Sequence, residues 1–145
     1  MADRELIDNL IGTYRDLNNR VRPLPEERLT MKGGDVSIRD VIRRMRNDEL
    51  RFSQALKERI SGVGMTEVFG PNAEPVIGTE QSHETTVTML AQFGTAREST
   101  LAQLRSISEE QWGANDAQSI RTMVSRLAAN DKKMMERIVG LLGSP

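Results

Sequence analysis

The sequence predicts an all-α fold, a four-helix bundle with a long crossover connection between its second and third helices. Three observations support this prediction. Four stretches carry apolar residues at helical spacing, no segment shows a convincing strand pattern, and about twenty residues join the second stretch to the third. The chain has 145 residues, and we expect a single domain over 1–145.

The first predicted helix carries one apolar stripe whose members are spaced three or four residues apart. The stripe comprises Leu6, Leu10, Tyr14, Leu17, Val21 and Leu24. Pro23 and Pro25 end this helix, because proline lacks the backbone N–H that the helical ladder needs.

The second predicted helix begins after Ser37, which is followed three residues later by Asp40 in a pattern close to a capping box. Its apolar face comprises Ile38, Val41, Ile42, Met45, Phe52, Ala55, Leu56 and Ile60. The connection over residues 61–80 is rich in Gly and Pro, and it is longer than the ~2–8 residues of a bundle hairpin. We therefore expect the second and third helices to run parallel.

The third predicted helix covers about residues 82–105, and the fourth begins near Ser119. The apolar residues of the third are Val87, Leu90, Phe93, Leu101 and Leu104. Those of the fourth are Ile120, Met123, Val124, Leu127, Met134, Ile138, Leu141 and Leu142. Between them, Ser108 and Gln111 form a second capping-box pattern, which predicts a short helical turn before Trp112.

The composition excludes several kinds of chemistry. The chain contains no Cys, which excludes disulfides, a thiolate nucleophile and cysteine-ligated zinc or iron–sulfur centres. A single His cannot supply a site of two or three imidazoles within one chain. The net charge of −1 argues against a nucleic-acid partner. With no apolar run of membrane-spanning length and no signal-peptide pattern at the N-terminus, we expect a cytoplasmic protein without a membrane partner.

Three charged residues interrupt the apolar stripes near the middle of their helices: Glu49, Arg97 and Asp131. A lone buried charge costs several kcal/mol, so we expect Arg97 to pair with Glu49 or with Asp131. Three interpretations remain open at this point. The residues form a closed polar layer that sets the helix register, they are solvated because the phase of a helix is misjudged, or they line a functional pocket.

Two segments resemble the DinB/YfiT-like superfamily. Residues 36–45, VSIRDVIRRM, are similar to the opening of that family's second helix, whose pattern is roughly W-S-[VI]-x-[DE]-[VLI]-[LIV]-x-H-L. Residues 119–131, SIRTMVSRLAAND, resemble its last helix, which ends in H-x-x-x-H. Helix order and the long connection agree as well, so the resemblance covers nearly the whole chain. It implies the bundle fold, a divalent metal held by three histidines and, in some members, thiol-dependent S-transfer.

The sequence departs from this family at the metal ligands. Arg44 stands at the histidine position of the second helix, Asn130 and Met134 stand at those of the fourth, and Val36 replaces the aromatic residue before Ser37. Arginine cannot ligate a metal, and an amide oxygen or a thioether is a poor ligand for Zn or Ni. We therefore expect no metal and no cofactor. Arg44 is expected to place its charge roughly where the metal would lie.

These observations predict a DinB-like protein that has lost its metal site and serves as a small-ligand-binding or interaction module. The expected ligand is small and either anionic or hydrophobic. The candidate pocket or polar-core residues are Arg44, Asp48, Glu49, Arg97, Asn130, Asp131 and Met134. One alternative is a metal-independent, thiol-dependent S-transferase-like enzyme in which Arg44 or Arg97 holds a carboxylate, so enzymatic activity stays open. Another is a structural or regulatory homodimer that associates through Ile7 and Ile11.

Two further features receive structural interpretations. The single histidine, His83, is expected to be a solvated or capping residue at a helix start. Arg39, Arg43 and Arg46 lie on one face of the second predicted helix, with Arg51 nearby, and make the best case for a phosphate-binding patch. Interleaved acidic residues and the lack of accompanying aromatics favour a solvated, ion-paired face instead.

Overall fold

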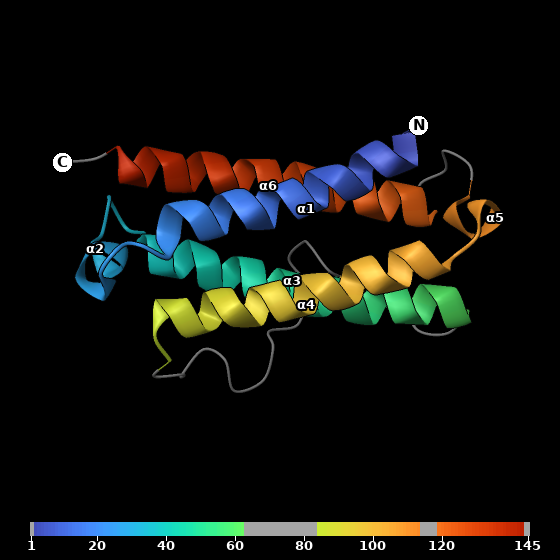
Figure 1. Cartoon of the computed structure of the whole chain (residues 1–145), viewed down its shortest axis with the longest axis horizontal. Helices are drawn as coiled ribbons and strands as arrows, with labels where there is room; N and C mark the ends of the chain where they lie inside the picture. The colour runs from blue at the N-terminus through green and yellow to red at the C-terminus, as the bar shows by residue number, and fades with distance from the viewer. Residues whose placement is uncertain (1, 63–83, 114–118, 144–145) are drawn as a thin grey trace.

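The protein is described by a computed structural model, which covers residues 2–62, 84–113 and 119–143 (Figure 1). These residues form helices and contain no strand, apart from an isolated bridge between Gly33 and Val36. The helices are α1 (Ala2–Val21), α2 (Glu26–Thr30), α3 (Ile38–Ser61), α4 (Thr86–Ser106), α5 (Glu109–Trp112) and α6 (Ile120–Leu142). The all-α class is therefore confirmed. Among the described residues, no helix is long and apolar enough to cross a bilayer.

The four long helices, α1, α3, α4 and α6, lie side by side along the long axis of the molecule (Figure 1). On the face between α3 and α4, Arg46 bonds to Gln92 and Ser53 bonds to Gln103, so residue numbers increase together along both helices. The two helices thus run in the same direction, as expected. The segment that joins them falls largely outside the described residues.

Local sequence signals set the helix ends. The Ser37 hydroxyl accepts from the Asp40 amide at 3.1 Å, and the Asp40 carboxylate accepts from the Ser37 amide at 3.0 Å, so the predicted capping box is present. Ser108 and Gln111 form the same reciprocal pair at the start of α5, as predicted. At the end of α3, Gly62 adopts a φ of 76°, a left-handed conformation that glycine takes without steric cost.

The Asp40 carboxylate also contacts Lys32, whose Nζ lies 2.9 Å from Oδ2. Burial raises the pKa of Asp40, but the hydrogen bonds from Lys32 and Ser37 together lower it by a larger amount. The pKa of Asp40 therefore lies below its ordinary value. The ionised Asp40 carboxylate therefore stabilises the N-terminus of α3.

Helix α1 ends at Val21, and the sequence did not predict the short helix α2 that follows the prolines. Leu24 lies beyond α1, contrary to the predicted stripe, yet it still packs on the core. In α2, Leu29 is buried and Arg28 donates to the carbonyls of Leu141 and Leu142 at 3.0 Å. These bonds attach α2 to the last turn of α6, whose terminal carbonyls have no partner within the helix.

Two helical glycines, Gly94 and Gly12, have opposite surroundings. A Cβ built on Gly94 of α4 would lie 2.6 Å from Cζ of Tyr14, so the absence of a side chain allows α1 and α4 to approach closely there. Gly12 on the same helix as Tyr14 is open, with no atom within 4 Å of an added Cβ.

The apolar interior consists of two clusters at opposite ends of the long helices. The first contains Leu17, Val21, Leu29, Ile38, Val41, Ile42, Met45, Met89, Leu90, Phe93, Met134 and Ile138. The second contains Leu10, Phe52, Leu56, Leu101, Leu104, Trp112, Ile120, Val124 and Leu127. On α3, α4 and α6 the boundary between the clusters is marked by a buried charged residue, Glu49, Arg97 and Asp131 respectively.

Candidate functional site

Arg97 occupies the centre of the molecule between the two apolar clusters. Its side chain is 1% exposed, and those of Glu49 and Asp131 are 0% and 5% exposed. Nε and Nη2 donate to the two Glu49 oxygens at 2.9 and 2.8 Å, while Nη1 and Nη2 donate to the two Asp131 oxygens at 2.8 and 2.9 Å. Both pairings that the sequence predicts are therefore present, and each is bidentate.

The remaining Arg97 donor reaches the carbonyl of Leu10 in α1 at 2.8 Å. A guanidinium has five N–H donors, and here all five are used. Its face also lies over the ring of Phe93, 4.9 Å from the centroid. Because the partners come from α1, α3 and α6 while Arg97 belongs to α4, one side chain connects all four long helices.

This polar layer, which comprises Arg97, Glu49 and Asp131, is closed. Burial alone would lower the pKa of Arg97, but the two carboxylates raise it well above its ordinary value, so the guanidinium stays charged. No donor of Arg97 is left for a ligand. The layer separates the two apolar clusters and sets the relative height of the helices, as in the first of the three interpretations above.

The family-resembling positions lie elsewhere, on the outer side of α3 and α6. Arg44, Asn130 and Met134 line a surface hollow of about 480 Å³ together with Lys133, Glu136 and Arg137. The sequence grouped these positions with Glu49, Arg97 and Asp131 as candidates for a pocket or a polar core. The structure separates the two sets: the latter three turn inward and saturate one another, whereas Arg44, Asn130 and Met134 line the hollow.

Asp48 joins α3 to α6 beneath this hollow. Its Oδ2 accepts from Asn130 Nδ2 at 3.2 Å and lies 3.7 Å from Arg44 Nε, and its Oδ1 accepts from Arg51 Nη2 at 2.6 Å. Burial raises the pKa of Asp48, although Arg51 and Arg44 act to lower it. Arg44 thus forms an ion pair with Asp48, but the Arg44 side chain is 60% exposed and its guanidinium remains accessible.

The residues at the hollow do not fit a divalent metal. A guanidinium has no lone pair to offer, and the amide and thioether of Asn130 and Met134 are weak ligands for Zn or Ni. Across the described residues, no group of three His, Cys, Asp or Glu side chains is placed to hold a metal ion. His83 lies outside these residues.

Two sequence predictions about the surface need correction. Arg46 is not solvated, since its side chain is 2% exposed and lies against α4. Its neighbours do form ion pairs, Arg39 with Glu26 and Arg43 with Asp40. The apolar residues proposed for a dimer contact, Ile7 and Ile11, are half-buried against the second apolar cluster. In both cases a packed neighbour covers a face that the helical pattern alone leaves exposed.

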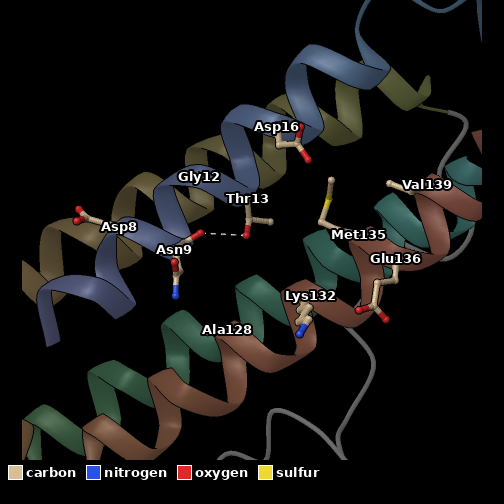
Figure 2. Close-up of a pocket in the computed structure, with 10 residues that line it drawn as sticks. All are labelled: Asp8, Asn9, Gly12, Thr13, Asp16, Ala128, Lys132, Met135, Glu136 and Val139. Atoms are coloured by element: carbon tan, nitrogen blue, oxygen red, sulfur yellow. Dashed lines mark hydrogen bonds between the residues drawn. The ribbon is translucent and has the colours of Figure 1, made fainter. Parts of the chain in front are cut away.

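Sequence reasoning missed a groove of about 700 Å³ between α1 and α6 (Figure 2). Its walls are Asp8, Asn9, Gly12, Thr13 and Asp16 on α1, and Ala128, Lys132, Met135, Glu136 and Val139 on α6. The small residues Gly12 and Ala128 leave it open, and Val139 is 45% exposed on its rim. The only available signal was the small and polar positions flanking the apolar stripe of α1.

Comparison of the chain with protein-family models, with curated proteins and with solved structures finds no match.

Proposed function

We propose that this chain is a DinB-like four-helix bundle, with a crossover between α3 and α4, that binds a small anionic ligand where its relatives hold a metal. The observation that carries the proposal is that Arg44, Asn130 and Met134 line one hollow. The resemblance picks out these positions as the ligand set, although they are 86 and 4 residues apart in the sequence. If the chain keeps the family's bundle and has replaced the metal ligands, these three positions should lie close together, as they do in this hollow.

Charge at the hollow favours an anion over an apolar ligand. Arg44, Lys133 and Arg137 contribute cationic groups to its lining, against one acidic residue, Glu136. Met134 is almost fully buried and offers little apolar surface. A guanidinium forms paired hydrogen bonds with a carboxylate, so a small carboxylate is the ligand class that this lining suits best.

Asp48 supports this role by holding Asn130 and positioning Arg44. Its bond to Asn130 ties α6 to α3 at the floor of the hollow, and the longer contact to Arg44 leaves that guanidinium able to turn toward a ligand. The ligand would then meet donors from both helices. We assign no chemical step to these residues, and the proposed function is binding.

The test is thermal unfolding and calorimetry of the full chain with small mono- and dicarboxylates at constant ionic strength. We expect saturable binding that weakens about tenfold in Arg44→Gln and Lys133→Gln, because each variant removes a cation from the lining. Arg20→Gln, which removes a surface ion pair on α1, is the matched control. Stoichiometric Zn or Ni in protein purified without chelator would overturn the proposal, as would turnover of an electrophile with a low-molecular-weight thiol.

A homodimer is the second candidate, and the α1–α6 groove is the observation that favours it. The groove presents Asp8 and Asp16 on one wall and both Lys132 and Glu136 on the other, so a two-fold rotation brings Lys132 of one copy opposite an α1 carboxylate of the other. Light scattering at low micromolar concentration tests this candidate. We expect a dimer that Gly12→Arg converts to a monomer, since the new side chain fills the groove. A wild-type monomer rules it out.

A further inference from the structure

Arg46 in α3 is buried without a full set of partners. Nε donates to Asn47 at 3.2 Å and Nη1 donates to Gln92 at 2.7 Å, both neutral amide oxygens. Nη1 also donates to the carboxylate of Glu84, at the longer distance of 3.4 Å. Nη2 is buried and has no hydrogen-bond partner. Because buried polar groups are nearly always paired, an unpaired nitrogen on a buried cation needs an explanation.

Arg43 shows the same feature one helical turn earlier. Its Nε is buried and unpartnered, and its Nη1 lies 3.6 Å from Asp40, beyond good hydrogen-bond distance. The other oxygen of Asp40 already accepts from Lys32 and Ser37. These two nitrogens, Arg43 Nε and Arg46 Nη2, are the buried side-chain atoms without a partner among the described residues.

Among the described residues, the ion pairs around these nitrogens contain four cations and three carboxylates. Arg39, on the same face of α3, is paired with Glu26, which also accepts from the amide and hydroxyl of Thr86 at the start of α4. The cations are Lys32, Arg39, Arg43 and Arg46, and the carboxylates are Glu26, Asp40 and Glu84. Burial lowers the pKa of Arg46, Glu84 raises it, and the nearby charges of Arg43 and Arg39 lower it further. An added anion would relieve this repulsion.

We propose that Arg43 and Arg46, in the second and third turns of α3, form an oxyanion site of the phosphate class beside the N-terminal half of α4. The two free donors belong to different guanidinium groups. A tetrahedral oxyanion presents acceptors in several directions and accepts from both, whereas a planar carboxylate is better matched to one fork. A phosphate group on a small molecule, or free phosphate, supplies this chemistry.

This site is independent of the hollow at Arg44, which lies on the α6 side of α3. It also differs from a nucleic-acid surface. The two donors are buried rather than arrayed along an exposed surface, and the side chains that bond to Arg46 are amides and a carboxylate without a base-stacking aromatic.

The experiment measures the unfolding temperature and the heat of binding of the full chain with inorganic phosphate and with a simple phosphate monoester. Ionic strength is matched with sodium chloride, which separates site binding from general screening. We expect saturable binding that weakens at least about tenfold in Arg43→Gln and in Arg46→Gln. Arg20→Gln, which breaks an exposed ion pair with Asp16 on α1, is the matched control and should bind phosphate as the wild type does.

The outcomes are distinct. If the monoester binds and inorganic phosphate does not, the ligand is a phosphorylated small molecule, and the reverse result assigns free phosphate. If Arg46→Gln does not fold, Arg43→Gln alone decides, because Arg43 is partly exposed. No saturable binding of either compound by the wild type overturns the proposal. So does binding that Arg44→Gln abolishes and Arg43→Gln leaves intact.

Discussion

Replacing Arg97 by methionine tests the polar layer most directly. The substitution keeps an unbranched side chain of related length but removes all five donors. It leaves the carboxylates of Glu49 and Asp131 and the carbonyl of Leu10 without this partner, in a region that water does not reach. Removing one member of a buried ion pair typically costs about 3–5 kcal/mol. We expect a loss of that size in the free energy of unfolding.

The assay is urea unfolding at neutral pH, followed by far-UV circular dichroism and by the fluorescence of Trp112, which is the single tryptophan and is buried in the second apolar cluster. For a domain of this size, the expected loss lowers the melting temperature by about 6–20 °C. Arg20→Met, which breaks an exposed pair with Asp16, is the control and should cost less than about 1 kcal/mol.

A triple variant distinguishes the cost of leaving buried charges unpaired from the cost of lost packing at Arg97. Arg97→Met combined with Glu49→Leu and Asp131→Leu removes every charge of the layer, and such replacements are often neutral or stabilising by about 1–4 kcal/mol. We expect it to be at least as stable as the wild type. If Arg97→Met does not fold, Arg97→Lys takes its place, because one ammonium cannot form both bidentate pairs. A cost below about 1 kcal/mol for Arg97→Met refutes the buried layer. A triple variant as unstable as the single one refutes the unpaired-charge explanation.

The remaining predictions concern pH, glycine and capping. The pKa of Asp40 is lowered in the folded protein, so the stabilisation by its carboxylate is lost as the pH falls below the ordinary aspartate pKa of 3.8. The pKa of Asp48 is raised, so the folded protein gains stability at this group as the pH falls toward 3.8. The difference in unfolding free energy between the wild type and Asp40→Asn, and the same difference for Asp48→Asn, should therefore change in opposite directions as the pH is lowered. Gly12→Ala should stabilise by about 1 kcal/mol in urea unfolding, and Gly94→Ala should destabilise by about the same amount through overpacking. Ser37→Ala should cost about 1 kcal/mol in the same assay by removing the cap of α3.

Each of these has a contrary result. Parallel pH profiles for the two aspartate variants would contradict the opposite pKa directions. Equal effects of alanine at Gly12 and Gly94 would show that α1 and α4 are not in close contact at Gly94. A stable Ser37→Ala variant would show that the capping box contributes little to α3.

The buried layer illustrates how far the sequence alone reaches. Glu49, Arg97 and Asp131 each replace an apolar residue in a helical stripe, so their inward direction and the pairing of Arg97 follow from periodicity and from the cost of a lone buried charge. The use of all five donors, including one on the Leu10 carbonyl, does not follow. The bond to Leu10 depends on the position of α1 along the bundle axis relative to α4, which no local sequence pattern specifies.

The hollow at Arg44 and the burial of Arg46 show the opposite limit. Both residues occupy outward positions in the periodic pattern of α3, yet Arg46 is covered by α4 and Arg44 is not. The pattern of one helix records which face is apolar but not which neighbour covers a polar face. The sequence therefore left open whether the candidate residues form a pocket or a closed layer.

The sequence by itself determined the all-α class, the start of α3 at its capping box, the short turn before Trp112 and the identity of the three inward charges. These depend on interactions within a few residues or on one helical period. Only the tertiary structure decided that Arg97 connects four helices, that the hollow and the layer are separate, and that two arginine nitrogens are left without partners. Those features depend on the distances and relative heights of helices that are far apart in the chain, and these are set by the packing of all the helices together.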